Sequence, residues 1–541
     1  MTLTWTYHAS ERVRSLFPCG PGPALGFFAM NTRRLLIAYA LLNAVLYSVL
    51  LPLWEGFDEP FHFAYVQQLA NGQGLPDSRT ARLSGEVGAS LLLAPASTAV
   101  KQNLPRVMSF SEYFSLPTPG RADLRRQLNE IPAGLRWQPA PFMNYQAHHP
   151  PLAYTLLAIP ERLLAGLRLP VRVVILRILI ALVGSFLLCT GARRLFQQIA
   201  IPESYSAAAL FCLFSSQMTW AASARIGNDW LAVPAAVWTL VALNRYEARR
   251  SPRAAAASAV ILSAGLLTKA YFLALVPLLV GMFVWRKRWR DLALASVLVC
   301  GLAGPWYARN LIQYGVLTGT QESRNGVDTG AILNAAPALE WQSSIPASIR
   351  SALWTGNNSF LTFSATTLNL LIGCALMALL FWAASRKANP EWITLSYCVL
   401  FVIALGYATT ASYIYTHGAA HQPSPWYAQV LSAPLLGLAL LGASRWGEAG
   451  RIVATLLVVL FGYILAATYA VKLIPLYGGY EGRVSLGSMT TLYGRRLGKV
   501  MSNLDTVSLA PAAVICVLAA MTISLVVIQQ VILIRRLNGS E

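Results

Sequence analysis

Residues 31–62 read NTRRLLIAYALLNAVLYSVLLPLWEGFDEPFH, a basic start followed by a long apolar run and then an acidic segment. The apolar run, residues 35–53, has about the 20-residue length that a helix needs to cross the hydrocarbon core of a membrane. Because Arg33 and Arg34 precede it, and basic residues flank the cytoplasmic ends of such helices, this span is predicted to start in the cytoplasm. The chain is therefore expected to leave the membrane on the outer side at Trp54.

The composition of the whole chain is also that of a membrane protein. Of the 541 residues, 56% are hydrophobic and only 12% are charged, whereas charged residues make up about 25% of an ordinary soluble domain. The net charge of +20 comes without a basic run interleaved with aromatic residues, so no nucleic-acid partner is predicted. The seven cysteines are scattered and all but Cys19 lie in apolar runs, which excludes a disulfide framework and a zinc cluster.

Residues 1–30 are predicted to form a cytoplasmic tail. They contain Arg12 and Arg14, and prolines and glycines interrupt residues 18–23, whereas a signal peptide needs an uninterrupted apolar stretch. The segment from Met30 onward is similar to the true N-terminal start of a protein. Residues 1–29 are therefore expected to be dispensable.

A long, mostly polar loop follows the first span and is predicted to lie outside the membrane. Loops longer than about 60 residues are exempt from the charge bias, so the many arginines of residues 54–150 agree with this location. Apolar residues recur at helical spacing from Phe61 to Leu69, before Gly72. This pattern predicts an amphipathic helix along the membrane surface.

Residues 151–170 are apolar but contain Pro160, Glu161, Arg162 and Arg168, so they could cross the membrane or lie on it. If they lie on it, every basic cluster between the later spans falls on the cytoplasmic side; if they cross it, all of those clusters fall outside. The segment is therefore predicted to be a second amphipathic surface helix, which extends the external loop over residues 54–170.

The later apolar runs bring the total to about twelve membrane spans, with both termini in the cytoplasm. After the first, the predicted spans are 171–191, 204–224, 230–243, 254–268, 271–285, 292–307, 368–384, 392–410, 426–442, 452–471 and 511–534. A single long span over residues 254–285 would put the basic cluster 286–290 outside, so a hairpin at Lys269 is favoured. The fold class is an all-α polytopic integral membrane protein.

The acidic segment after the first span places several reactive side chains at the predicted outer face. Glu59 and His62 are three residues apart and share a helix face. A carboxylate beside an apolar wall suits a general base. The alternative for Asp58 is an N-cap, since it stands directly before Glu59 and Pro60, and the two interpretations are compatible.

Paired histidines close the long loop. His148 and His149 precede a double proline, which forces an extended backbone. We favour substrate hydrogen bonding over metal binding for them, because adjacent histidines point in different directions. A divalent ion (Mg, Mn or Zn) held by Glu59 and His62 with His148 or His149 stays open as the alternative.

Three cations stand at the outer ends of apolar helices, against the usual charge bias: Arg225, Lys269 and Arg309. A lipid phosphate whose tail lies in the bilayer would explain them, through fork-like hydrogen bonds. The alternatives are an internal ion pair between Arg225 and Asp229, and cations that extend to the membrane surface.

The later external segments mix aromatic residues with Asn, Gln, Gly and histidine, including His417, His421 and Tyr427. Such a mixture suits a sugar-binding wall, although an interfacial aromatic belt explains the Trp and Tyr residues equally well. The sequence lacks GxxxxGK[ST], GxGxxG, HExxH and GxSxG elements, which disfavours nucleotide-driven transport, nucleotide-sugar binding and familiar hydrolases.

These motifs resemble the GT-C superfamily of polyprenyl-phosphate-sugar glycosyltransferases, especially the protein O-mannosyltransferase-like and aminoarabinose-transferase-like members. The resemblance is carried by the acidic pair before His62, by HPPLAY at residues 149–154, and by the segments SARIGNDWLA, GLLTKAYF and PWYARN. It implies that Asp58 is the base, that Glu59 and Asp229 are further acids of the catalytic site, and that Arg225 and Lys269 bind phosphate. Relatives often carry an Arg-Tyr pair where this chain has Trp426 and Tyr427.

The resemblance implies an inverting transfer of a sugar from a polyprenyl-phosphate donor to an acceptor hydroxyl on a glycan, lipid or protein. It places the enzyme in the inner membrane of a bacterium with a periplasmic active site. Residues 31–310 would form the GT-C module, and residues 311–541 a second transmembrane module with external loops 308–367, 411–426 and 472–509. The alternatives are a flippase for a lipid-linked glycan, which would need polar residues along the middle of its spans, and a glycan polymerase.

Overall fold

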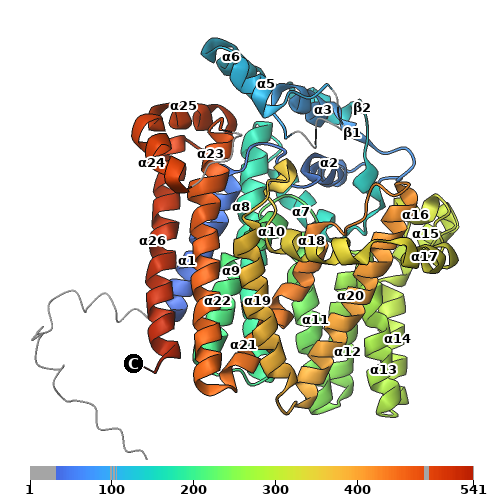
Figure 1. Cartoon of the computed structure of the whole chain (residues 1–541). Helices are drawn as coiled ribbons and strands as arrows, with labels where there is room; N and C mark the ends of the chain where they lie inside the picture. The colour runs from blue at the N-terminus through green and yellow to red at the C-terminus, as the bar shows by residue number, and fades with distance from the viewer. Residues whose placement is uncertain (1–31, 98–99, 101–103, 105, 481–485, 540–541) are drawn as a thin grey trace, which may run out of the picture.

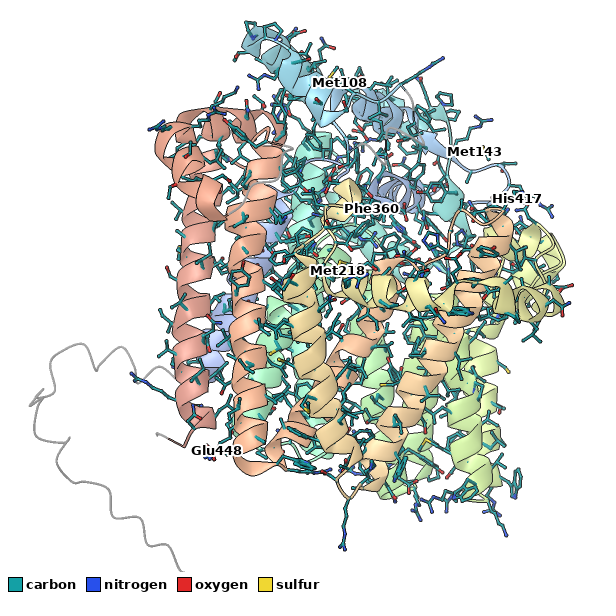
Figure 2. The ribbon with its side chains drawn as sticks, in the orientation of Figure 1. Met108, Met143, Met218, Phe360, His417 and Glu448 are labelled. Carbon is teal, nitrogen blue, oxygen red and sulfur yellow. The ribbon has the colours of Figure 1, made fainter. Side chains whose placement is uncertain are left out.

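The computed structural model describes residues 32–97, 100, 104, 106–480 and 486–539. The predicted cytoplasmic tail, residues 1–30, lies outside them. Figure 1 shows long helices side by side, with a layer of shorter elements over one end of them. In Figure 2, Met108 and Met143 lie in this layer, whereas Glu448 lies at the opposite end of the helices.

Apolar helices form the bundle and make the chain a multi-pass membrane protein. Among the described residues, six helices are long and apolar enough to cross a membrane, or seven if a bent pair counts as one span. The six are α8 (Leu169–Gln198), α19 (Ala365–Ala383), α20 (Asn389–Tyr415), η8 with α21 (Pro425–Ser444), α22 to α23 (Gly447–Tyr477) and α26 (Ala512–Leu537). The bent pair is α14 (Trp289–Leu302) and α15 (Gly304–Tyr314), which meet at 54°.

The predicted number of about twelve spans is not confirmed, although all twelve predicted runs are helical. The remaining runs form helices that are not both long and apolar enough to count as spans: α1 (Thr32–Leu50), α9 (Glu203–Ser215), α10 (Gln217–Ser223), α11 (Asp229–Arg249), α12 (Pro252–Leu266), and η5 with α13 (Ala270–Leu275 and Val276–Trp285). Several are short because the chain breaks within a predicted run, as at Ser216. The predicted hairpin is confirmed, since Lys269 has an extended backbone between α12 and η5.

The break at Ser216 frees backbone carbonyls inside the apolar bundle, where each needs a hydrogen-bond donor. The carbonyl of Phe214 accepts from the Tyr39 hydroxyl (3.2 Å), the Asn43 amide (3.2 Å) and the Trp220 indole (2.9 Å). Two of these three donors come from α1, which packs against α9.

The layer over the bundle is built from the long first loop. Its elements are α2 (Glu59–Ala70), β1 (Arg82–Ser84), α3 (Gly85–Leu93), α5 (Phe110–Ser115), α6 (Thr118–Asn129), η3 (Ala133–Trp137), β2 (Pro139–Met143), η4 (Tyr145–His148) and α7 (Leu152–Leu163). The antiparallel pair of β1 and β2, with Arg82 opposite Met143, departs from the all-α prediction.

The two predicted surface helices differ from each other. α2 is helical as predicted but is not amphipathic, because ten of its residues are buried, among them Glu59 and His62. α7 buries Tyr154 and Leu157 and exposes the apolar side chains of Ile159 and Leu163, as expected of a helix that lies against the membrane. At about 1.5 Å per residue its twelve residues are too short to cross a membrane.

Short helices also occupy the predicted later loops. They are α16 (Gln321–Arg324), α17 (Thr329–Ala335), η6 (Ala336–Ala338), α18 (Trp341–Leu353), η7 (Asn357–Ser359), α24 (Leu486–Arg495) and α25 (Leu497–Val507). In the loop predicted at residues 472–509, helical backbone continues from α22 through η9 (Thr468–Leu473) to the end of α23 (Ile474–Tyr477).

Buried charges are paired where the layer meets the bundle. Arg172 of α8 forms ion pairs with Glu86 of α3 and Glu161 of α7, and all three side chains are at most 3% exposed. Because an unpaired charge in such surroundings costs several kcal/mol, these pairs fix how α3 and α7 sit on α8.

Glu55 makes the stability of this junction depend on pH. Burial raises the pKa of Glu55 to about 8, although a hydrogen bond from Ser97 opposes the shift. The folded protein therefore keeps a proton that the unfolded chain releases above about pH 4.5, so the free energy of unfolding falls between pH 4.5 and pH 8.

We predict that Glu55→Gln removes this pH-dependent part of the stability. The melting temperature of the variant in detergent should therefore decline less between pH 4.5 and pH 8 than that of the wild type. Glu130→Gln, at an exposed glutamate directly after α6, is the control and should follow the wild type. An unchanged pH dependence in Glu55→Gln would contradict the prediction.

Candidate active site

Asp58 stands at the N-cap position of α2, but its side chain does not cap the helix. Its backbone is left-handed, with φ 56°, a conformation that Asp tolerates better than most residues. The carboxylate instead accepts a hydrogen bond of 2.6 Å from the Tyr145 hydroxyl. Of the two compatible sequence interpretations, the structure supports a carboxylate available for other chemistry.

The pKa of Asp58 is raised above its usual value. Burial is the largest cause; the Tyr145 hydrogen bond and the charges of Arg225 and Lys269 oppose it. The side chain nevertheless keeps some exposure to solvent. A partly accessible carboxylate with a raised pKa suits proton abstraction.

Histidines and tyrosines form a stacked group beside Asp58. His62 Nδ1 is hydrogen-bonded to the Tyr154 hydroxyl at 2.7 Å. The His62 and His149 rings stack with centroids 5.8 Å apart, and the Tyr154 ring stacks on Tyr65 at 4.1 Å. Burial lowers the pKa of both His62 and His149 well below the usual value, so both rings are neutral at pH 7.

Glu59 is held by two groups and is fully buried. Its carboxylate forms an ion pair with Arg177 of α8, whose Nε donates to Oε1 at 2.7 Å. The same oxygen accepts from the backbone amide of Ile226 at 2.9 Å. Arg177 also donates to the carbonyls of Leu51 (2.6 Å) and Pro52 (2.9 Å), directly after α1. In this geometry Glu59 holds α2 against α8 and the segment at Ile226. Its predicted catalytic role stays a prediction.

Asp229 joins the two cations predicted to bind phosphate. Its Oδ2 lies 2.7 Å from Nη2 of Arg225, and its Oδ1 lies 2.5 Å from Nζ of Lys269. The internal ion pair that the sequence left open for Arg225 is therefore present. All three side chains are at most 4% exposed. Their predicted roles in catalysis and phosphate binding stay predictions.

Arg225 is fixed more firmly than Lys269. It also donates to the carbonyls of Ala221 (3.0 Å) and Phe57, and its guanidinium lies over the rings of Phe57 and Trp426. Lys269 has one carboxylate partner, and its ammonium lies 4.3 Å from the centroid of the Tyr427 ring. Burial lowers the pKa of Lys269 to about 8, although Asp229 opposes the shift.

Two glycines allow this close packing around Arg225. A Cβ at Gly56 would lie 2.7 Å from Cβ of Arg225, and one at Gly227 would lie 2.9 Å from its Nη1. Glycine at both positions thus lets the backbone of two loops pack closely against the Arg225 side chain.

The structure brings Asp58, Glu59, His62, His149, Arg225, Asp229, Lys269 and Tyr427 together at one end of the bundle. Phe57, next to Asp58, contacts Phe360, with ring centroids 5.6 Å apart, and Figure 2 shows Phe360 between the layer and the long helices. Asp58 and Arg225 therefore face the same side. Which compartment this side faces stays a prediction.

Other predicted site residues lie at or beyond the edge of this group. His148 is half-buried, with its ring 4.1 Å from that of His149. Arg309 contacts the carbonyl of Pro76 at 3.0 Å. His417 and His421 are exposed, and Figure 2 shows His417 at the periphery, above α20.

The residues named as possible metal ligands have other partners in the structure. In the part of the chain that the structure describes, no three His, Cys, Asp or Glu side chains are placed to hold a metal ion. Glu59, one of the three predicted ligands, is instead bound by Arg177 and the Ile226 amide. The metal alternative with Glu59, His62 and His149 as ligands stays a prediction, and it would require the Glu59 carboxylate to exchange its guanidinium partner for the ion.

Sequence reasoning missed Arg177 and Tyr145. Arg177 lies within the apolar run predicted as span 171–191, and an ionisable residue inside such a run is itself a signal of a specific buried partner. Tyr145 lies in the segment before the paired histidines, and nothing in its spacing indicates that it contacts Asp58, 87 residues away.

No protein-family model and no curated protein matches this chain. Among solved structures, it is similar to the crystal structure of ArnT from Cupriavidus metallidurans bound to undecaprenyl phosphate, with a TM-score of 0.48 and 13% identity over 94% of this chain and 78% of that chain. It is also similar to ArnT from Cupriavidus metallidurans in the apo state, with a TM-score of 0.39 and 13% identity over 86% and 75% of the two chains. The resemblance to the GT-C superfamily therefore rests on the sequence motifs given above.

We predict that Arg177→Met lowers the free energy of unfolding by about 3–5 kcal/mol, because it leaves the Glu59 carboxylate buried without its charged partner. Thermal unfolding in detergent measures this effect. Arg194→Met, at an exposed arginine of the same helix, should change stability little.

The double variant Glu59→Met with Arg177→Met separates charge from packing. It should recover part of the lost stability, since neither charge is then unpaired. A double variant less stable than Arg177→Met would show that the ion pair is not the cause.

Proposed function

We propose that this protein is a membrane glycosyltransferase that moves a sugar from a polyprenyl-phosphate donor to an acceptor hydroxyl, with Asp58 as general base. The observation that carries the proposal is a partly exposed carboxylate beside two buried cations at the end of an apolar bundle. The motif resemblance to GT-C enzymes supports the same reaction.

The reaction is a single displacement with inversion. Asp58 takes the proton of the acceptor hydroxyl while its oxygen bonds to the anomeric carbon of the donor sugar. The bond from that carbon to the phosphate oxygen breaks, and polyprenyl phosphate leaves with one more negative charge. Tyr145 orients the Asp58 carboxylate through its 2.6 Å hydrogen bond.

Lys269 is the group best placed to stabilise the leaving phosphate. Its ammonium has three N–H donors, and among the described residues only Asp229 accepts a hydrogen bond from it. Arg225 donates to two carbonyls and to Asp229. We therefore assign to it the role of holding the Asp229 carboxylate and the Phe57 backbone in place. Positive charge aimed at developing phosphate charge is an effective form of catalysis.

An apolar groove beside this cluster suits the lipid part of the donor. It lies between α7 and α8, has a volume of about 230 Å³ and is lined by leucine, isoleucine, proline and valine side chains together with Trp230. Trp230 directly follows Asp229, so a prenyl chain in the groove would bring its phosphate close to the Asp229 pair. Exposed Leu163 and Ile159 belong to the same wall.

We predict that Asp58→Asn abolishes sugar transfer while the protein still folds, because Asn keeps the shape and tolerates the left-handed backbone but cannot accept the proton. The assay incubates purified protein with polyprenyl-phosphate sugars and follows release of the phosphate carrier. Normal turnover in Asp58→Asn would refute the base assignment. A flippase or a polymerase of lipid-linked oligosaccharides would not consume the monosaccharide donor.

We also predict that Tyr145→Phe moves the acid limb of the pH–rate profile to higher pH. The Tyr145 hydrogen bond lowers the pKa of Asp58, so its loss raises that pKa, and the base is then ionised only at higher pH. Tyr113→Phe, which removes a hydroxyl bonded to the Thr506 carbonyl, is the matched control and should keep the wild-type profile. A loss of rate without a shift would show that Tyr145 only supports the local fold.

A further inference from the structure

A polar pocket, separate from the apolar groove, lies where the loop after α2 meets α15, α16 and the end of α20, on the side of the molecule where Figure 1 labels α15 and α16. Its volume is about 280 Å³, and it is lined by Arg79, Tyr314, Gln321, Arg324, Asn325 and Tyr415. It shares no lining residue with the apolar groove between α7 and α8.

Three guanidinium groups surround the ring of Tyr314. Arg79, Arg309 and Arg324 lie 5.2, 5.9 and 5.6 Å from its centroid. The ring itself is fixed, because its hydroxyl donates to Asp77 at 3.1 Å and accepts from the Ser78 amide at 3.1 Å. An aromatic face attracts cations, but three like charges around one ring repel each other unless an anion joins them.

The arginines that line the pocket have unused donors. Among the described residues, the Arg79 guanidinium has no hydrogen-bond partner, and Arg324 donates only to the Ser78 carbonyl, at 3.3 Å. The Nε of Arg324 is buried without a partner. Each guanidinium has five N–H donors, so most of those in this pocket have no partner among the described residues and are available to a ligand.

The nearby carboxylates are hydrogen-bonded to groups other than these guanidiniums, although the charge of Arg79 helps to lower the pKa of Asp77. Asp77 accepts from Tyr314, from Gln313 (3.0 Å) and from the Arg79 backbone amide (2.9 Å). Glu322 accepts from the Ser412 hydroxyl at 3.1 Å. No arginine side chain forms an ion pair with either acid in the described part of the chain. The pocket therefore has positive charge and donors that suit an anion.

The pocket lies next to the candidate active site. Tyr65 of α2 donates to the carbonyl of His149 at 3.3 Å, and the charge of Arg309 acts on Tyr65, lowering its pKa against the effect of burial. Burial lowers the pKa of His148, and the charges of Glu322 and Arg324 act on it as well. A molecule in the pocket can thus extend toward His148 and Asp58.

We propose that this pocket binds an anionic group, a phosphate or a carboxylate, on the acceptor, so that the acceptor is an acidic sugar unit. This inference rests on the proposed glycosyltransferase function. Guanidinium forks bind both anions in a bidentate manner, and the amides of Gln321 and Asn325 suit the neighbouring hydroxyls. A volume of 280 Å³ is at the lower end of small-molecule sites and fits a single sugar unit.

The test measures binding of glucose 1-phosphate to the purified full-length protein in detergent by equilibrium dialysis at low ionic strength, where charge screening is weak. Glucuronate, inorganic phosphate and glucose are the comparison probes. The double variant Arg79→Gln with Arg324→Gln removes the pocket's two charges. Arg82→Gln with Arg126→Gln removes the same amount of charge from positions of the first loop outside the pocket.

We expect one saturable site for glucose 1-phosphate or glucuronate, at least about tenfold weaker in the pocket variant. The control variant should differ from the wild type by less than about twofold. Arg79→Gln alone, at an exposed residue, provides the same comparison should the double variant be unstable.

Unchanged affinity in the pocket variant, or equal binding of glucose, would overturn the proposal. Inorganic phosphate that binds as tightly as glucose 1-phosphate would overturn the sugar part of it. Displacement by a short-chain polyprenyl phosphate would assign the pocket to the donor and overturn the acceptor assignment. Because binding needs no turnover, a wild type that binds the anion but does not consume polyprenyl-phosphate sugars would refute the proposed function alone.

Discussion

The carboxylate of Glu59 joins three separate segments: α2, on which it lies, α8 through Arg177, and the turn before α11 through the Ile226 amide. Arg177 in turn holds the carbonyls that follow α1. Asp58 precedes Glu59 and Arg225 precedes Ile226, so one buried ion pair sets the distance between the candidate base and the cationic cluster. A buried ion pair of this kind adds little stability compared with apolar packing, but removing one partner costs several kcal/mol. The pair therefore suits a role in positioning the segments rather than in adding net stability.

Around that anchor, charge is balanced within an apolar environment. Asp58 and Asp229 oppose Arg225 and Lys269, and burial moves the pKa of Asp58 upward and that of Lys269 down to about 8. Both shifts favour the neutral form, and the opposite charges of the cluster limit each shift. Neutral His62 and His149 beside them add hydrogen-bonding capacity without adding charge.

Much of this arrangement could be predicted from local patterns. The apolar runs predicted the helices, and the break at Lys269 followed from the position of the basic cluster after it. α7 was expected at the surface because a crossing there would put the basic clusters between all later spans on the outer side. The same patterns could not show that α2 is buried, because its partners, α7 and the elements around β1, come from distant residues of one loop. They also could not distinguish a cation that binds a ligand from one that pairs with Asp229, since both occupy the end of an apolar helix. Arg177 marks the limit most clearly: its charge was visible in the sequence, but its partner 118 residues earlier was not.

The interrupted helix at Ser216 has a consequence for how the protein is made. The carbonyl left free by the interruption depends on Tyr39 and Asn43 of α1, and Tyr39 also contacts the Ser215 hydroxyl at 2.8 Å. Within α9 and α10, the Trp220 indole donates to this carbonyl, but the two hydrogen bonds from α1 and the contact of Tyr39 with the Ser215 hydroxyl would be absent if the pair entered lipid alone. Since α1 leaves the ribosome first, its side chains are already present when the interrupted pair arrives, and co-translational insertion in chain order supplies the missing partners.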